Sequence, residues 1–245
     1  MQLATGGDML NFGYWNGKAT DPIAAQNDLC SLVGEMAELE SAKRLIDVGS
    51  GLGVPAAQWG SAYGSLDISC VNINFQQLLA SRHAGKISQL NATSTVLPFA
   101  DKCADRIIAL ESAQHFRPLD RFIKEARRVL LPGGLLVVAI PVMSQAHPFF
   151  GLGILAWTWS SEHYRLDHVK SVIENYGFSI KEVRFIGHHV YEPLTDYYIL
   201  HRSVLRERIL KRYPSFLEKI LYRSLLKMKD ISEKGIIDYV IIKAA

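Results

Sequence analysis

An apolar run that leads directly into three alternating glycines constrains the fold of this 245-residue chain more than any other feature. Residues 45–53 read L-I-D-V-G-S-G-L-G, and residues 54–60 have a composition compatible with a helix. Because residues 44–48 form a short, β-rich run, we predict a buried parallel strand there, with the glycines on a strand-to-helix turn. Glycine permits positive φ and has no Cβ, and the first N–H groups of a helix lack intrahelical partners. The segment therefore predicts a loop whose backbone approaches a nucleotide-like ligand.

Expected strands and helices alternate through the first 141 residues. Apolar positions at helical spacing predict a helix over residues 22–41, before the glycine loop. Beyond the loop we expect strands at 66–73, 87–92, 106–110 and 135–140, helices at 75–84 and 119–130, and a turn at 131–134. Strands that alternate with helices in this way indicate an α/β fold with a doubly wound, mostly parallel sheet.

The composition changes after Pro141. Residues 143–200 are rich in aromatic residues and histidines, which suggests a substrate-binding cap folded around late sheet elements. We expect a helix at 166–176, a strand at 177–185, a long helical segment at 201–230 and a closing strand at 236–243. The predicted organisation is a core at 1–141, a cap region at 142–232 and a last strand of the core sheet within 233–245.

The spacing of the glycines distinguishes between ligands. A dinucleotide-binding loop reads G-x-G-x-x-G, with an acid about 20 residues further on. Here the third glycine comes one position earlier, and Asp47 precedes the first. This D-x-G-x-G-x-G pattern resembles motif I of the class I S-adenosylmethionine-dependent methyltransferases. A glycine turn without a ligand is the alternative.

That resemblance has consequences for fold, cofactor and site. It implies a Rossmann-like, seven-stranded sheet with a helical, aromatic cap inserted before the final strand. The implied cofactor is S-adenosyl-L-methionine, with S-adenosyl-L-homocysteine as the product. The motif places five residues of the loop at the cofactor: Asp47, Gly49, Ser50, Gly51 and Gly53.

Two asparagines follow the second strand, where this family often has an acid that binds the ribose. The segment N-I-N-F-Q-Q at 72–77 resembles small-molecule and lipid methyltransferases, among them natural-product O-methyltransferases and tocopherol-type and cyclopropane-forming enzymes. An asparagine side chain both donates and accepts, so Asn72 or Asn74 can meet a ribose diol. The resemblance also places Ile73 and Gln77 at the cofactor. In the alternative, one asparagine only caps the next helix.

A threonine and a serine stand in the segment that borders the adenine in this family. Residues 92–101 resemble the family pattern G-D-A-x-x-L-P-F-x-D, with Thr93 where Asp is commoner. The Thr93 hydroxyl can still bond the adenine amino group, and the Ser94 N–H can meet a ring nitrogen. We therefore expect both residues at the cofactor.

The end of the fourth strand carries the predicted catalytic residue. Residues 109–116 read A-L-E-S-A-Q-H-F, and in related O-methyltransferases a histidine in this context serves as general base. The resemblance assigns that role to His115 and places Glu111 and Ser112 at the cofactor. An imidazole with a pKa near 6.5 is mostly neutral at pH 7 and can take a hydroxyl proton. A histidine that only packs against the cofactor is the alternative.

The group that would orient this histidine is not identified by the sequence. Some relatives have a carboxylate at the end of the fifth strand, where this chain has A-I-P at 139–141. Four side chains remain candidates: Glu111, His188, Glu192 and Asp196. Alternatively, no strong base is needed, because methyl transfer to an acidic hydroxyl relies mainly on in-line placement and desolvation.

Aromatic residues in two places are expected to close over the site. Residues 10–15 resemble a segment that covers the cofactor in this subgroup, so we expect contacts from Tyr14 and Trp15. A hydrophobic staple at the N-terminus would also explain these aromatics. The residues expected to contact the acceptor are Gln114, Trp157, Trp159, His188, Tyr191 and Tyr197.

Charge and cysteine content exclude some classes of protein. A formal net charge of +3 is too small to indicate nucleic acid binding, and no nucleic-acid module is recognisable. Three widely spaced cysteines suggest neither a disulfide framework nor a metal site. The sequence lacks a secretory signal pattern and a membrane-span-length apolar run, so we expect a cytoplasmic protein.

The basic charge is concentrated in residues 201–230, where nine lysines and arginines stand against three acids. Interleaved apolar residues, interrupted near Pro214, could place this segment on an anionic membrane surface. The alternative is a lid helix that packs its apolar side on the cap and exposes a solvated face.

We therefore predict an S-adenosylmethionine-dependent methyltransferase that acts on a small, largely apolar acceptor. Oxygen is the expected nucleophile. The alternatives are carbon methylation of a quinone, isoprenoid or lipid-like acceptor, and a protein that binds the cofactor without methylating. The acceptor, the methylated atom and the oligomeric state are not legible in the sequence.

Overall fold

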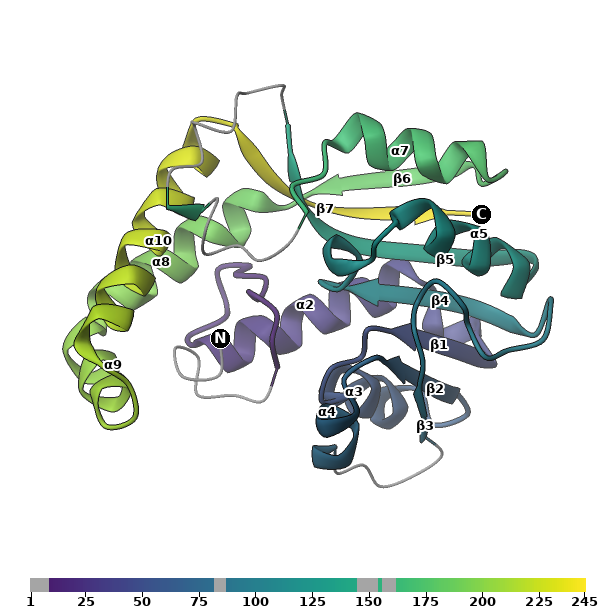
Figure 1. Ribbon diagram of the computed structural model, residues 1–245, viewed down its shortest axis with the longest axis horizontal. Coiled ribbons are helices and arrows are strands. Elements are labelled where there is room, and N and C mark those ends of the chain that lie inside the picture. The colour runs from purple at the N-terminus through teal and green to yellow at the C-terminus, as the bar shows by residue number, and fades with distance from the viewer. Residues whose placement is uncertain (1–8, 82–86, 145–153, 156–161) are drawn as a thin grey trace.

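One mixed β-sheet forms the centre of the protein. The computed structural model describes residues 9–81, 87–144, 154–155 and 162–245. Its seven described strands are β1 (Arg44–Val48), β2 (Asp67–Asn72), β3 (Ile87–Asn91), β4 (Ala104–Leu110), β5 (Leu130–Met143), β6 (Ile180–Phe185) and β7 (Ile237–Ala244). They are ordered β3-β2-β1-β4-β5-β7-β6 across the sheet (Figure 1).

Helices cover the sheet and form the cap. The α-helices within the described residues are α2 (Pro22–Met36), α3 (Val54–Ala62), α4 (Phe75–Ala80), α5 (Leu119–Val129), α7 (Leu166–Asn175), α8 (Tyr191–Leu200), α9 (Arg202–Leu210) and α10 (Ser215–Glu233). Three short 3-10 helices lie between them: η1 (Leu39–Ser41), η2 (Ala113–His115) and η4 (Gly187–His189). None of these described helices has both the length and the apolar character required to cross a membrane.

The central strands are buried on both faces. Successive side chains of a strand point to opposite faces, so Ile107 joins the core under α5 and α7, whereas Ile108 joins the core under α2 and α3. Val137 and Val138 of β5 divide between the two cores in the same way. A strand covered on both sides needs a continuous apolar run rather than alternation, which explains the composition of β4 and β5.

The expected fold is confirmed. β1 pairs in parallel with β2 and β4, β2 with β3, and β4 with β5. β7 runs antiparallel to both β5 and β6, so the sheet is mixed but mostly parallel. The helices α8, α9 and α10 are inserted between β6 and β7, in front of the final strand (Figure 1).

The first predicted helix is too long. The helix over 22–41 ends at Met36, and Glu38 takes a left-handed conformation with φ of 53° before η1 begins. Arg106 of β4 explains the early end, because its Nε donates to the carbonyl oxygen of Ala37 at 2.5 Å. Arg106, 69 residues away in the sequence, therefore satisfies the carbonyl oxygen of Ala37, which a longer helix would have bonded to one of its own N–H groups.

The turn predicted at 131–134 lies inside strand β5. Ala104 pairs with Leu130, and pairing resumes between Arg106 and Leu135, so the residues between them bulge out of the ladder. Gly133 has a φ of +79°, which a bulge of this kind accommodates. The prediction of a turn before a strand at 135–140 is therefore wrong: residues 131–134 form an irregularity within the strand.

A buried carboxylate holds the three cap helices together. Glu218 of α10 is 1% exposed, and Arg202 of α9 donates from Nε to its Oε1 at 2.8 Å. Arg206 lies 3.7 Å from its other oxygen, and the Tyr198 hydroxyl of α8 donates to Oε1 at 3.3 Å. These ion pairs lower the pKa of Glu218. The predicted interruption near Pro214 is confirmed, because α9 and α10 are separate helices.

Candidate active site

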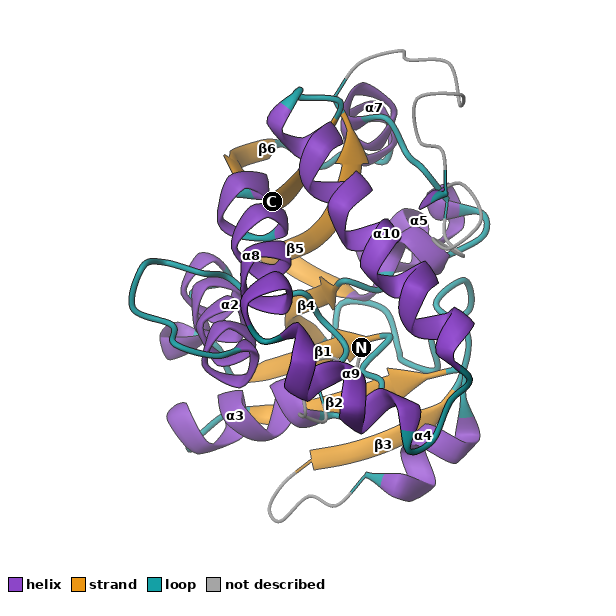
Figure 2. Cartoon of the chain, turned by 90° about the vertical axis from the view of Figure 1, so that its left-hand side faces the viewer, coloured by secondary structure: helices purple, strands orange, loops and turns teal. Residues whose placement is uncertain are grey.

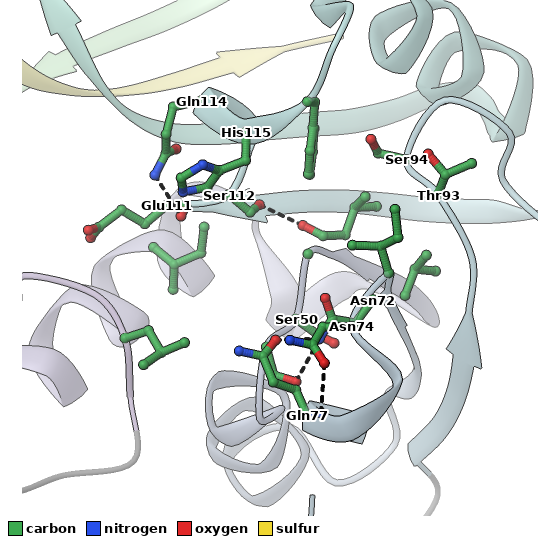
Figure 3. A pocket seen from close by; sticks show the side chains of 18 of the residues that line it. Ser50, Asn72, Asn74, Gln77, Thr93, Ser94, Glu111, Ser112, Gln114 and His115 are labelled. Atoms are coloured by element: carbon green, nitrogen blue, oxygen red, sulfur yellow. Dashed lines mark hydrogen bonds between the residues drawn. The ribbon is translucent and has the colours of Figure 1, made fainter. Parts of the chain in front are cut away.

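A cavity of about 590 Å³ opens at the carboxyl ends of β1, β2 and β4. Open α/β sheets bind ligands at this edge. The lining comes from the ends of these strands, the glycine loop, the segment after β3 and residues 10–12. Figure 3 shows that Ser50, Asn72 and Gln77 lie across the cavity from Glu111, Gln114 and His115.

The glycine loop fits tightly against the end of β4. Gly49 has a φ of +78°, and its N–H donates to the carbonyl oxygen of Val71 at 2.7 Å. A Cβ at Gly49 would fall inside the contact distance of Ser112 Cβ, while the Ser112 hydroxyl donates to the carbonyl oxygen of Val48 at 2.7 Å. Gly49, Ser50 and Gly51 line the cavity, whereas Gly53 lies behind it as the N-cap of α3. Only glycine suits position 49, because any side chain would push the loop away from β4.

Asp47 lies beneath the loop rather than in the cavity lining. Its side chain is 2% exposed, and Oδ2 has no hydrogen-bond partner among the described residues. Burial raises the pKa of Asp47 to about 7. A buried carboxylate without a partner is costly, so this oxygen marks a place where a ligand donor would be accommodated.

The two asparagines at and after the end of β2 have different roles. Asn74 is the N-cap of α4, and its Oδ1 accepts from the N–H groups of Gln76 and Gln77 at 3.1 and 3.3 Å. Asn72 instead donates from Nδ2 to the carbonyl oxygen of Gly51 at 3.1 Å and to Gln77 Oε1 at 2.9 Å. Ile73 lines the cavity beside them.

Asn91, which the sequence analysis did not predict as a site residue, holds the end of β2 in place. Asn91 of β3 donates from Nδ2 to the carbonyl oxygens of Asn72 and Ile73 at 2.9 and 3.0 Å. Thr93 and Ser94, two residues beyond β3, both line the cavity. The signal for Asn91 was weak, because an asparagine at a strand end has no distinctive spacing.

Glu111 joins several parts of the structure at the end of β4. Its Oε2 accepts from the Phe12 N–H at 2.9 Å and from the Tyr239 hydroxyl at 3.3 Å. Burial raises the pKa of Glu111 to about 8. The backbone φ of 50° is unusual for a glutamate. The N-terminal segment, β4 and β7 therefore meet at one carboxyl group.

Gln114 and His115 follow on η2. Gln114 donates from Nε2 to the carbonyl oxygen of Glu111 at 2.8 Å, and its Oε1 is buried without a partner among the described residues. His115 is exposed and lines the cavity, with its backbone N–H bonded to the carbonyl oxygen of Ser112 at 2.9 Å. Figure 3 shows the imidazole between Gln114 and Ser112 at the cavity wall. An unpartnered acceptor and an imidazole thus face the same space.

The predicted aromatic contacts lie elsewhere. Tyr14 packs edge-on against His189, with ring centroids 5.1 Å apart, and Trp15 packs against Tyr197 at 5.5 Å. Tyr191 is fully buried against Phe12. The cavity lining contains none of Tyr14, Trp15, His188, Tyr191 and Tyr197. Trp157 and Trp159 lie outside the described residues.

Residues that the sequence analysis did not single out line the cavity instead of these aromatic residues. Leu10, Asn11 and Phe12 line the cavity, and Gly13 separates them from the predicted aromatic pair Tyr14 and Trp15. Arg117 also lines it, and its Nε lies 2.8 Å from Glu162. Within the motif over residues 10–15, the first three residues line the cavity, whereas Tyr14 and Trp15 pack on His189 and Tyr197.

Comparison with known proteins identifies the class that this fold and site define. A family model described as a methyltransferase domain matches residues 46–138. Methyltransferase GfsG from Streptomyces halstedii is 28% identical over 72% of the chain and 68% of that protein. Erythromycin 3''-O-methyltransferase from Saccharopolyspora erythraea is 28% identical over 81% of the chain and 71% of that protein.

A solved structure shows the same fold over the whole chain. The structure titled as a sarcosine dimethylglycine methyltransferase from Galdieria sulphuraria superposes with a TM-score of 0.83 at 16% identity, covering 99% of this chain and 95% of that one. The chain carries a methyltransferase domain and is an S-adenosylmethionine-dependent methyltransferase. It is a methyltransferase of small molecules that uses S-adenosyl-L-methionine.

The geometry of the site fits this cofactor. The loop at Gly49 has no room for a Cβ, so backbone alone meets the ligand there. Asp47 beneath the loop and Gln114 in the cavity lining each have a buried oxygen without a partner among the described residues. Amide and hydroxyl groups of Asn72 and Thr93 line the remaining wall.

Proposed function

We propose that the protein methylates a hydroxyl group of a small, largely apolar acceptor, with His115 as the general base. One observation carries this proposal: His115 lines the same cavity as the glycine loop, from the opposite wall. The loop would hold the cofactor, and the histidine would then stand beside the acceptor. The O-methyltransferase relatives support oxygen as the nucleophile.

The chain's residues hold the cofactor in this proposal through backbone and neutral polar groups. The Cβ-free surface of Gly49 and Gly51 would lie under its methionine and ribose parts. Asp47 would accept hydrogen bonds from the loop and, directly or through a water molecule, from the cofactor. Asn72, already oriented by Gly51 and Gln77, presents its remaining oxygen to the ribose.

Other residues would contact the adenine and close the open side of the cavity. Thr93 and Ser94 border the adenine, and Ser112 supports the loop from below. Tyr14 and Trp15 act indirectly, because their packing on the cap anchors residues 10–12 over the cavity.

When bound, S-adenosylmethionine supplies an electrophilic methyl group on a sulfonium. His115 would accept the hydroxyl proton as the acceptor oxygen bonds to the methyl carbon and the bond from that carbon to sulfur breaks, which leaves S-adenosylhomocysteine. Gln114 lines the cavity beside His115 and helps to shape the side of the cavity that the acceptor would occupy. Leu10, Phe12 and Leu110 exclude water from the reacting atoms, which strengthens the effect of in-line placement.

A labelling experiment tests the proposal directly. The purified protein is incubated with methyl-labelled S-adenosylmethionine and a metabolite extract of its source organism, and the labelled products are isolated. We expect a labelled methyl ether or ester, recognised by the carbon chemical shift of a methyl on oxygen. A methyl group on carbon would overturn the assignment of oxygen, and the absence of any transferred label would overturn the proposed reaction.

A further inference from the structure

The tip of the cap carries an apolar stripe that the protein does not bury. Phe216, Leu217 and Ile220 follow the spacing i, i+1 and i+4 on one side of α10, and Tyr213 lies in the turn just before this helix. All four are exposed, and Phe216 is 56% exposed. This membrane-facing candidate, here called the tip stripe, lies at the start of α10, where α9 and α10 join (Figure 2).

The cap core is complete without the tip stripe. Leu205 and Ile209 of α9 and Leu225 and Met228 of α10 are buried against α8 and the rest of the core. Glu218, two residues from Phe216, points inward to its arginine partners. The helices α9 and α10 are therefore held in place by their buried side chains, and the tip stripe faces away from these side chains.

The surroundings of the tip stripe are mostly cationic, and the exposed acid nearest in sequence, Glu207 of α9, is paired with Lys211. Between Arg208 and Lys229 the sequence contains one acidic residue, Glu218, and that residue is buried and paired. Four cations of this stretch form no ion pair within the described residues: Arg208, Arg212, Lys219 and Arg223. The exposed surface at the tip is thus apolar along its centre and cationic at its borders.

We propose that the tip stripe docks the protein on an anionic lipid membrane surface. Aromatic and aliphatic side chains enter the boundary between headgroups and acyl chains, while flanking lysines and arginines meet anionic headgroups. A second copy of the chain fits less well, because two such tips would bring like charges together. Nucleic acid would engage the cations but would leave the apolar side chains without a partner.

Two matched pairs of variants separate the apolar and the electrostatic parts. Phe216→Ala is compared with Phe185→Ala, because Phe185 is 51% exposed but lies on β6 in the core domain. Lys219→Gln is compared with Lys181→Gln, an exposed lysine of the same strand β6. Neither test residue belongs to the cavity, so methyl transfer and cofactor binding should not change.

Binding is measured by sedimentation with phosphatidylcholine vesicles, with and without phosphatidylglycerol, at low and high salt. We expect salt-sensitive binding only to the vesicles with phosphatidylglycerol. Phe216→Ala should weaken it about ten-fold and Lys219→Gln about five-fold, with no change in the two β6 variants. The proposal fails if binding ignores anionic lipid, if the tip variants bind like the wild type, or if Phe216→Ala instead dissociates a dimer seen by light scattering. Binding to RNA without binding to vesicles would also overturn it.

Discussion

Gly49→Ala tests the packing of the cofactor loop against β4. The alanine would keep a φ of +78°, and its Cβ would lie 2.8 Å from Ser112 Oγ and closer still to Ser112 Cβ. A left-handed backbone conformation costs a non-glycine residue about 1–2 kcal/mol. Alanine also makes the unfolded chain less flexible than glycine does, which offsets about 0.4–1 kcal/mol of this cost. The overlap with Ser112 adds about 1–3 kcal/mol. The expected loss in the free energy of unfolding is therefore about 2–4 kcal/mol.

Gly133→Ala is the matched control. Gly133 has nearly the same φ, +79°, but a Cβ there would have no atom within 4 Å. It should lose about 1 kcal/mol, because only the backbone cost applies. The difference between the two variants isolates the overlap with Ser112.

Urea denaturation followed by tryptophan fluorescence measures both free energies, and calorimetry with S-adenosylhomocysteine measures the affinity of the loop for its ligand. Gly49→Ala should lose affinity because the loop must move out of the cavity wall, whereas Gly133→Ala should keep it. Equal stability of the two variants, or unchanged affinity in Gly49→Ala, would refute the reasoning.

Three further predictions concern the titratable groups of the site. His115→Asn should lower kcat about 10²–10⁴-fold with unchanged affinity for S-adenosylhomocysteine, since the imidazole acts on the acceptor proton; unchanged turnover would exclude a base. The pKa of Glu111 is about 8, above the value near 4.5 of the unfolded chain, so the wild type should lose stability as pH rises from about 4.5 to 8. In Glu111→Gln, which keeps an acceptor for the Phe12 N–H, urea titrations should show a smaller loss; an equal slope would contradict the assignment. Asp47, with a pKa of about 7, should weaken cofactor binding as pH falls below 7, and calorimetry on Asp47→Asn should show a flatter pH profile.

The sequence predicted most of what depends on local pattern. Strand β1, the glycine loop and η2 could be located because an apolar run, alternating glycines and the A-L-E-S-x-x-H context are contiguous. The mixed sheet followed from the alternation of elements and the family resemblance. Bulges and helix ends were less accessible, because Arg106 and the register between β4 and β5 decide them from a distance.

The hydrogen-bond partner of each side chain could not be predicted from the motif alone, although Asn72 and Asn74 both line the cavity. Asn72 and Asn74 have the same side chain and lie two residues apart, but Asn74 caps α4 while Asn72 binds Gly51 and Gln77. Tyr14 and Trp15 were the most prominent residues of their segment, yet they pack on the cap. In both cases the partner that decides the orientation belongs to a different element of the fold.

The conformation of Glu111 shows how these long-range partners bear on the site. A glutamate with a φ of 50° is strained by about 1–3 kcal/mol, so its surroundings must over-determine it. Its carboxyl accepts from Phe12 and Tyr239, and its carbonyl oxygen accepts from Gln114. Each bond joins a different part of the protein to the end of β4: the segment over the cavity, the closing strand and the turn that carries His115. The same residue therefore sets the position of the cavity cover and of the proposed base, which is why a change in its charge should be felt in both stability and catalysis.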